Sequence, residues 1–277
     1  MTRHGVDAAR QSFPVPGRPG EVVALGWAAA TDVGRRRQTN EDSLVVVPPV
    51  FAVADGMGGH TAGDRASAAA AERLSALGDR DDIDSEVVIG ALRQAAHDID
   101  ELAELLPLGA GTTVTGAVLE LAGGPPRFLV FNVGDSRVYG FEGNELIQIT
   151  HDHSVVQELV DAGLIDAQDA EAHPESNVVT RALGFREDPQ PDFWEIPLRA
   201  GMRLLLCSDG LTKELSASRI HLHLAARLSP AETAGALVDA ALAAGGRDNV
   251  TVIVLDVLDA PAHVSAPHAD DAAGARG

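Results

Sequence analysis

The chain has 277 residues, and 41 acidic against 21 basic side chains give it a formal charge of −20 at pH 7. That charge argues against a nucleic-acid binder, which needs basic groups against phosphates, and against docking on anionic lipid, which needs clustered Lys and Arg. Hydrophobic residues make up 45% of the chain and its mean hydropathy is +0.03, so one sizeable folded domain is favoured over disorder.

The folded domain is predicted to span residues 21–259. Residues 1–20 end in a run of Pro and Gly and are interpreted as a flexible leader, and residues 260–277, without periodicity, as a disordered tail. Short apolar runs bounded by turn residues predict nine strands between them: Val22–Ala28, Ser43–Val47, Val50–Ala54, Thr112–Leu119, Arg127–Val133, Arg137–Phe141, Glu145–Ile149, Arg203–Ser208 and Val250–Val257.

Longer amphipathic stretches predict five helices, at Ala62–Leu77, Ser85–Leu106, Ser154–Ala162, Ser216–Arg227 and Pro230–Ala244. Thr61 and Asp64 have the spacing of a capping box for the first helix. Strands come in clusters that alternate with helices, which favours antiparallel sheets with helices packed outside. The predicted fold class is therefore α+β, with a sandwich architecture.

Cysteine and lysine are each present once. Cys207 alone permits no internal disulfide and no cysteine-based zinc site. Lys213 is the only lysine, and the preference for arginine elsewhere is interpreted as a habit of composition. No apolar run approaches the roughly 18–20 residues of a membrane span, and the first twenty residues lack the apolar centre of a signal peptide. These features favour a cytoplasmic protein with no membrane partner.

Acidic residues gather at the ends of the predicted strands, several of them beside glycine: Glu41, Asp42, Asp55, Asp135, Asp209 and Asp248. A single Asp-Gly is more typical of a turn. Asp55 and Asp209, however, each end an unusually apolar strand, which would hold both carboxylates at the same kind of edge. Two bare carboxylates about 4 Å apart repel by about 4 kcal/mol at an effective dielectric near 20. Such a cluster indicates hard divalent cations with oxygen ligands rather than zinc.

A run of three arginines, Arg35–Arg37, precedes Glu41 in this otherwise acidic chain. Alone, such a run is typical of a solvated turn. Four residues before Glu41, however, a guanidinium would reach the metals, where its fork matches phosphate. Metals together with arginine indicate phosphoryl transfer to an activated water.

Six motifs, in this order, resemble those of the metal-dependent protein phosphatases of type 2C, in their bacterial branch: Asp32–Ser43, Ala54–His60, Gly111–Thr113, Asn132–Arg137, Cys207–Gly210 and Arg247–Thr251. The resemblance spans about residues 22–258. It implies a β-sandwich of two antiparallel sheets flanked by α-helices, with a metal centre in a cleft at one edge.

The resemblance implies a ligand set for two Mn²⁺ or Mg²⁺ ions. Asp55 would bridge the two ions, and Asp209 and Asp248 would complete the first. Glu41 and the main-chain carbonyl of Gly56 would hold the second ion.

The resemblance also implies a third, weaker ion between Asp135 and Asp209. Asp42 would fix bound water, and Arg37 would bind the substrate phosphate. Asp55, Asp42 and Arg37 are therefore the expected catalytic residues, and a water held between the two ions would attack phosphorus directly.

One position departs from the eukaryotic members, which carry a histidine proposed as general acid where this chain has Met57. A thioether cannot donate a proton. Bacterial members share the methionine, which leaves a metal-bound water as a candidate acid; His60 is a less favoured candidate. Since no covalent phosphoenzyme is required, Cys207 is expected to be dispensable.

Asp152–Arg181 matches the family's flap, which opens close to His151 and His153, both interpreted as solvated. Between Asp152 and Glu195 there are eleven acidic residues against two arginines. An acidic flap rim is expected to favour phosphosites with basic neighbours.

The function implied is a protein serine/threonine phosphatase that acts on phosphorylated proteins, with Ser/Thr kinases and their substrates as partners. One alternative is the related branch that dephosphorylates an anti-anti-sigma factor, whose members usually carry a sensory or membrane region of which this sequence shows no sign. A second alternative is a pseudophosphatase that binds phosphoproteins without turnover. That alternative predicts lost metal ligands, whereas Glu41, Asp55, Asp209 and Asp248 are present.

Overall fold

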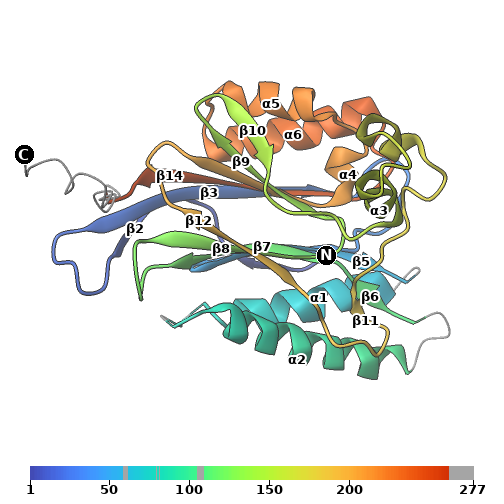
Figure 1. Cartoon of the computed structure of the whole chain (residues 1–277), viewed down its shortest axis with the longest axis horizontal. Helices are drawn as coiled ribbons and strands as arrows, with labels where there is room; N and C mark the ends of the chain where they lie inside the picture. Colours follow the sequence, from blue (N-terminus) through green and yellow to red (C-terminus); the bar gives the residue numbers. More distant parts are fainter. Residues whose placement is uncertain (59–61, 79, 81, 105–108, 262–277) are drawn as a thin grey trace, which may run out of the picture.

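Two β-sheets lie face to face in the computed structural model, and helices cover the outer face of each sheet (Figure 1). The structure describes residues 1–58, 62–78, 80, 82–104 and 109–261. No helix in these ranges is long and apolar enough to cross a bilayer.

The first sheet has eight strands and is covered by α1 (Ala62–Ser75) and α2 (Ser85–Ala103). Short strands β6 (Gly111–Thr112) and β11 (Leu183–Gly184) extend it beside β5. Its main strands run in the order β1 (Arg3–Gly5), β4 (Asp42–Val47), β5 (Val50–Met57), β7 (Val114–Glu120), β8 (Arg127–Val133) and β12 (Asp192–Pro197).

The second sheet has six strands and is covered by α5 (Ala217–Ala225) and α6 (Pro230–Ala244), with the short α4 (Asp209–Thr212) at its end. The segment between Gln148 and Leu183 carries α3 (Val155–Asp161) and a 3₁₀ helix at Ala167–Ala172. The strand order is β10 (Glu145–Gln148), β9 (Arg137–Glu142), β13 (Arg203–Cys207), β14 (Val250–Asp259), β3 (Val22–Asp32) and β2 (Ala8–Pro14).

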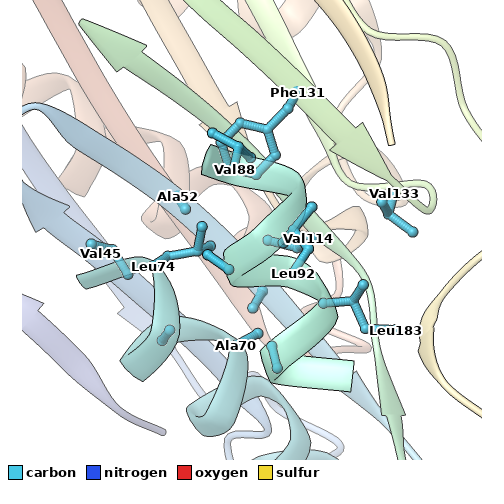
Figure 2. Close-up of a cluster of buried hydrophobic side chains, with 14 of the residues drawn as sticks. Val45, Ala52, Ala70, Leu74, Val88, Leu92, Val114, Phe131, Val133 and Leu183 are labelled. Atoms are coloured by element: carbon cyan, nitrogen blue, oxygen red, sulfur yellow. The ribbon is translucent and has the colours of Figure 1, made fainter. Parts of the chain in front are cut away.

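Central strands are apolar on both faces because each lies between a helix layer and the other sheet. In β4, Leu44 and Val46 pack between the sheets, whereas Val45 packs against the helices. Figure 2 shows the helix side of this arrangement, where Leu74 lies near Val45 and Leu92 lies near Val114. Strand alternation therefore divides the apolar residues among three layers of core and makes the sheets a rigid base for the chain ends that leave them.

Helix ends follow the local signals of the sequence. Asp84 caps α2 by accepting a hydrogen bond from the Val87 main-chain N–H at 2.9 Å. Ser229 and Glu232 form a capping box at α6, with Pro230 in the first turn. The capping box expected from Thr61 lies outside the described residues.

The predicted α+β class and the two sheets flanked by helices are confirmed, and each predicted strand and helix has a counterpart. β1 and β4 pair in parallel, so the first sheet is mixed rather than purely antiparallel. The prediction missed β11, β12 and α4, and the strand predicted at Thr112–Leu119 is divided into β6 and β7.

The N-terminal end differs from the predicted flexible leader. Residues 1–20 contain β1 and β2, and β2 pairs with β3 at the edge of the second sheet. Phe13 packs against the core between the sheets, and Val15 is buried there. The Trp27 indole Nε1–H also donates to the Val6 carbonyl at 2.9 Å. Apolar anchors thus hold a segment whose Pro and Gly content indicated a loose chain. Most of the predicted tail, residues 262–277, lies outside the described residues.

Candidate metal centre

Five of the six predicted carboxylates converge on one cleft, of about 1040 Å³, at the same end of both sheets. Pairing of β4 with β5 sets Asp42 opposite Asp55. Asp209 follows β13, and Asp248 precedes β14, which is the neighbouring strand. The members that line the cleft are Glu41, Asp55, Asp135, Asp209 and Asp248, together with Arg37 and Gly56.

Asn249 joins the segments that carry these acids. Its side-chain oxygen accepts from the Glu41 main-chain N–H at 2.8 Å, and its amide donates to the Val33 and Thr39 carbonyls, both at 2.9 Å. Gly210 lets the turn that carries Asp209 lie close to the main chain of Asn249, because a Cβ at position 210 would collide with the Asn249 main-chain oxygen. The site is therefore a meeting point of three chain segments far apart in the sequence.

Replacing Asn249 with alanine is expected to lower the free energy of unfolding by about 2–4 kcal/mol, since three main-chain groups lose their partner. Chemical denaturation of the variant measures this loss. Thr31→Ala is a useful comparison, because it removes a hydroxyl that contacts Asn40 and Thr251 without touching Asn249. A loss for Asn249→Ala no larger than that for Thr31→Ala would contradict the role given to Asn249.

Asp42 lies behind the cleft and is fully buried. Its Oδ2 accepts from the Ser208 hydroxyl at 2.9 Å and from the Thr251 hydroxyl at 2.6 Å, whereas its Oδ1 has no hydrogen-bond partner in the described structure. Burial raises the pKa of Asp42 to about 7, against the opposing effect of the two hydroxyls. The unpartnered oxygen is free to accept a proton or a hydrogen bond from a bound water.

Burial and neighbouring carboxylates disfavour the ionised forms of Asp55 and Asp135. Burial first, and then repulsion from neighbouring carboxylates, raises the pKa of Asp55 well above its usual range. Burial and repulsion from Asp209 raise the pKa of Asp135 to about 7. The Asp55 main-chain oxygen accepts from the Thr113 N–H at 2.9 Å, which fixes the strand end that carries the carboxylate. Cations would stabilise the ionised form of both groups.

Two cationic side chains hold the carboxylates at one side of the cleft. Arg37 forms an ion pair with Asp248, with Nε 2.8 Å from Oδ1, and its Nη2 donates a hydrogen bond to Oδ2 at 3.0 Å. Lys213 Nζ contacts Asp209 Oδ2 and lies 3.3 Å from Asp248 Oδ2. Arg35 differs from Arg37, because its Nε donates away from the acids to the Leu242 carbonyl at 2.8 Å.

The donor set fits hard divalent cations. All the side-chain donors are carboxylates, and the buried Asp209 Oδ1 has no hydrogen-bond partner in the described structure. Among the described residues, no group of three His, Cys, Asp or Glu side chains is arranged to hold one ion as the side chains stand. Arg37 and Lys213 pair with oxygens of Asp248 and Asp209 that a cation would need.

His153 is buried, which corrects the prediction that it is solvated. Its Nδ1 accepts from the Gly134 main-chain N–H at 3.1 Å, and its Nε2 lies 3.1 Å from Asp192 Oδ2. The predicted exposure holds for His151, which lies 2.8 Å from Asp161 Oδ2. His153 thus joins the start of the predicted flap to the turn that carries Asp135.

The sequence singles out three further residues: Met57, Cys207 and His60. Met57 lines the cleft, as expected for the residue in the place of the histidine. Cys207 is buried in the core beneath α5 and α6, and burial raises its pKa to about 12, so it carries no reactive thiolate. The role considered for His60 falls on a residue outside the described ranges.

Sequence reasoning missed three residues of the site. In the sequence Asn249 stands out only as part of a motif, and no pattern indicates Phe185, which is half-exposed at the cleft. Lys213 was attributed to composition, although it is the only lysine and follows Asp209 by four residues. That spacing places both side chains on one face of a helical turn and was the signal available.

Comparison with known proteins gives consistent similarities. A family model described as Protein phosphatase 2C matches residues 35–244. The chain is 40% identical to the serine/threonine protein phosphatase PstP of Mycobacterium tuberculosis over 86% of this chain but only 46% of PstP, so it spans less than half of that relative. It is 36% identical to the serine/threonine phosphatase stp of Listeria welshimeri, over 82% of this chain and 93% of that protein.

A solved structure of the catalytic domain of PstP in complex with two manganese ions superimposes with a TM-score of 0.75. The sequences are 39% identical, over 86% of this chain and 99% of that one.

Proposed function

This chain belongs to the protein phosphatase 2C family, and we propose that it is a metal-dependent protein serine/threonine phosphatase that hydrolyses phosphoserine and phosphothreonine in proteins. The observation that carries the proposal is the convergence of five carboxylates and Arg37 on one cleft. The manganese-bound PstP structure supports Mn²⁺ or Mg²⁺ as the metal.

The proposed ligands are those expected from the motifs. Asp55 would be shared by two ions, with Asp209 and Asp248 on the first and Glu41 and the Gly56 carbonyl on the second. Asp135 also lines the cleft, which supports a third ion between it and Asp209. Such cations supply charge neutralisation at the phosphoryl group and a water that is nucleophilic at neutral pH.

The chain's own residues bind and orient the substrate. Arg37 is half-exposed at the cleft, and its Nε and Nη2, which now contact Asp248, would bind two phosphoryl oxygens. Asp42 is held rigidly through Oδ2, so that its Oδ1 can accept a proton or a hydrogen bond from water in the site. The Ser or Thr oxygen of the substrate would leave from the side of phosphorus opposite the attacking water and would take its proton from a water molecule in the cleft.

A phosphothreonine peptide tests the proposal. Phosphate release is expected with Mn²⁺, is expected to stop with excess EDTA, and is expected to return when Mn²⁺ is restored. Stoichiometric binding of the peptide without phosphate release would support the pseudophosphatase alternative. Release that EDTA leaves unchanged would contradict a metal-dependent mechanism.

The proposed partners are phosphorylated proteins, in particular Ser/Thr kinases and their substrates, and the proposed location is the cytoplasm. The relatives' names support phosphoprotein substrates. We further propose that residues 21–259 form the body of the catalytic domain, to which β1 and β2 of residues 1–20 add edge strands, with residues 152–181 as a flap beside the cleft. Asn177, Thr180 and Arg181 of this segment line the cleft, which supports that position.

The acidic rim of the cleft is expected to favour phosphosites with basic neighbours. Some of these acids are already paired, for example Asp188 with Arg93 at 2.9 Å, whereas Glu187 lines the cleft and is exposed. At low salt, a phosphothreonine peptide flanked by arginine is expected to have a kcat/KM about 3- to 10-fold above that of its alanine-flanked match, and added salt should reduce the difference. Equal rates for the two peptides at low salt would refute this preference.

A further inference from the structure

Lys213 lies inside the carboxylate cluster although nothing in the proposed reaction requires it. It follows α4 directly, and its main-chain N–H donates to the Asp209 carbonyl at 2.8 Å. The short helical turn therefore carries Asp209 and Lys213 on the same face. The lysine side chain is 21% exposed and lines the cleft.

The ammonium group bridges two carboxylates that come from different strands. Nζ contacts Asp209 Oδ2 and lies 3.3 Å from Asp248 Oδ2, so one positive charge serves both acids. Lysine is suited to this position because its charge is compact and its stem is flexible. In the absence of metal, the contact offsets part of the repulsion between Asp209 and Asp248.

The same contacts leave Asp248 without a vacant side-chain oxygen. Its Oδ1 accepts from the Asn249 main-chain N–H at 2.9 Å and lies 2.8 Å from Arg37 Nε, and its Oδ2 accepts from Arg37 Nη2 and from Lys213 Nζ. The Asp209 oxygen bound by Lys213 is occupied as well, although Asp209 Oδ1 has no hydrogen-bond partner in the described structure. A divalent ion that binds both acids must therefore compete with the ammonium.

We propose that Lys213 is a tethered cation that competes with the divalent metal for Asp209 and Asp248. This inference rests on the metal centre of the proposed function. It adds that the lysine stabilises the metal-free fold, weakens metal binding at this half of the site, and so sets the metal concentration at which the enzyme becomes loaded.

Lys213→Met tests the inference, because methionine keeps an unbranched stem of similar length and removes the charge. Isothermal titration with Mn²⁺ is expected to give a Kd at least about tenfold below that of the wild type for this half of the site. The metal-free variant is expected to melt at a lower temperature than the metal-free wild type. Saturating Mn²⁺ is expected to raise its melting temperature by more than it raises that of the wild type.

Arg219→Met is the matched control, since Arg219 is exposed on α5 and its loss changes the net charge equally. This control is expected to bind Mn²⁺ as the wild type does, which separates a local contact from a change in overall charge. If Lys213→Met is unfolded without metal, the inference predicts that Mn²⁺ restores folding.

Equal or weaker Mn²⁺ binding by Lys213→Met, or a variant that stays unfolded with Mn²⁺, would overturn the role of Lys213 and leave the proposed phosphatase intact. A wild type that binds no Mn²⁺ would instead overturn the metal centre itself. The two failures are therefore distinguishable in the same titration.

Discussion

Replacing Asp55 with asparagine is expected to reduce Mn²⁺-dependent hydrolysis of a phosphothreonine peptide by about 10³-fold, the equivalent of about 4 kcal/mol in the barrier. Asp55 ends the apolar strand β5 and lies opposite Asp42 on β4, at the floor of the cleft. In the proposed site it is the one carboxylate shared by both ions. The substitution therefore weakens both metal positions while it changes the side-chain volume very little.

The fold of this variant is expected to survive, which distinguishes a functional from a structural effect. Burial and neighbouring carboxylates raise the pKa of Asp55, so its ionised form destabilises the metal-free protein near neutral pH. A neutral asparagine relieves that repulsion, and the metal-free melting temperature should not fall. Asp239→Asn, on the exposed face of α6, is the control for loss of one acid. Activity of Asp55→Asn within tenfold of that control would contradict the site.

Replacing Arg37 with alanine is expected to lower kcat/KM for the same peptide by about 10²-fold, chiefly through KM, because two charged hydrogen bonds to the phosphoryl group are lost. Steady-state kinetics at saturating Mn²⁺ measures this loss. Arg37→Lys should recover only part of it, since lysine keeps the charge but not the fork.

Arg35→Ala provides the neighbouring control for Arg37. The Arg35 guanidinium donates to the Leu242 carbonyl and points away from the acids, so its removal should leave KM close to that of the wild type. Similar losses for Arg35→Ala and Arg37→Ala would indicate a general effect of positive charge. Unchanged kinetics for Arg37→Ala would refute its role in phosphate binding.

Local patterns were sufficient to predict most of the fold. The predicted strand Arg127–Val133 and helix Pro230–Ala244 match β8 and α6 at both ends, because apolar runs, capping residues and glycine act within a few residues. β2 was missed because its place depends on Phe13 packing against a core built from strands distant in the sequence. Its own sequence has polar residues at positions 10–12 and no alternation of apolar and polar positions, so it carried no strand signal.

The roles of the site residues were predicted from the family motifs, because the strand and turn patterns alone did not assign them. Strand ends suggested that Asp55 and Asp209 lie at similar edges, and the structure brings both to one cleft. The partners of His153 could not be predicted, because Gly134 and Asp192 are 19 and 39 residues away in the sequence. The contact of Lys213 with Asp248 spans 35 residues and could not be predicted for the same reason. Its contact with Asp209, in contrast, follows from helical spacing.

The most direct test of the carboxylate cluster as a metal centre is a crystal of the protein grown with Mn²⁺ and measured at the manganese absorption edge. The anomalous difference map is expected to show two strong peaks in the cleft, both beside Asp55, one toward Asp209 and Asp248 and the other toward Glu41. Lys213 Nζ is expected to have left the position it holds between Asp209 and Asp248. A map with no peak at these carboxylates at saturating Mn²⁺, or with peaks only elsewhere on the protein, would contradict the proposed site.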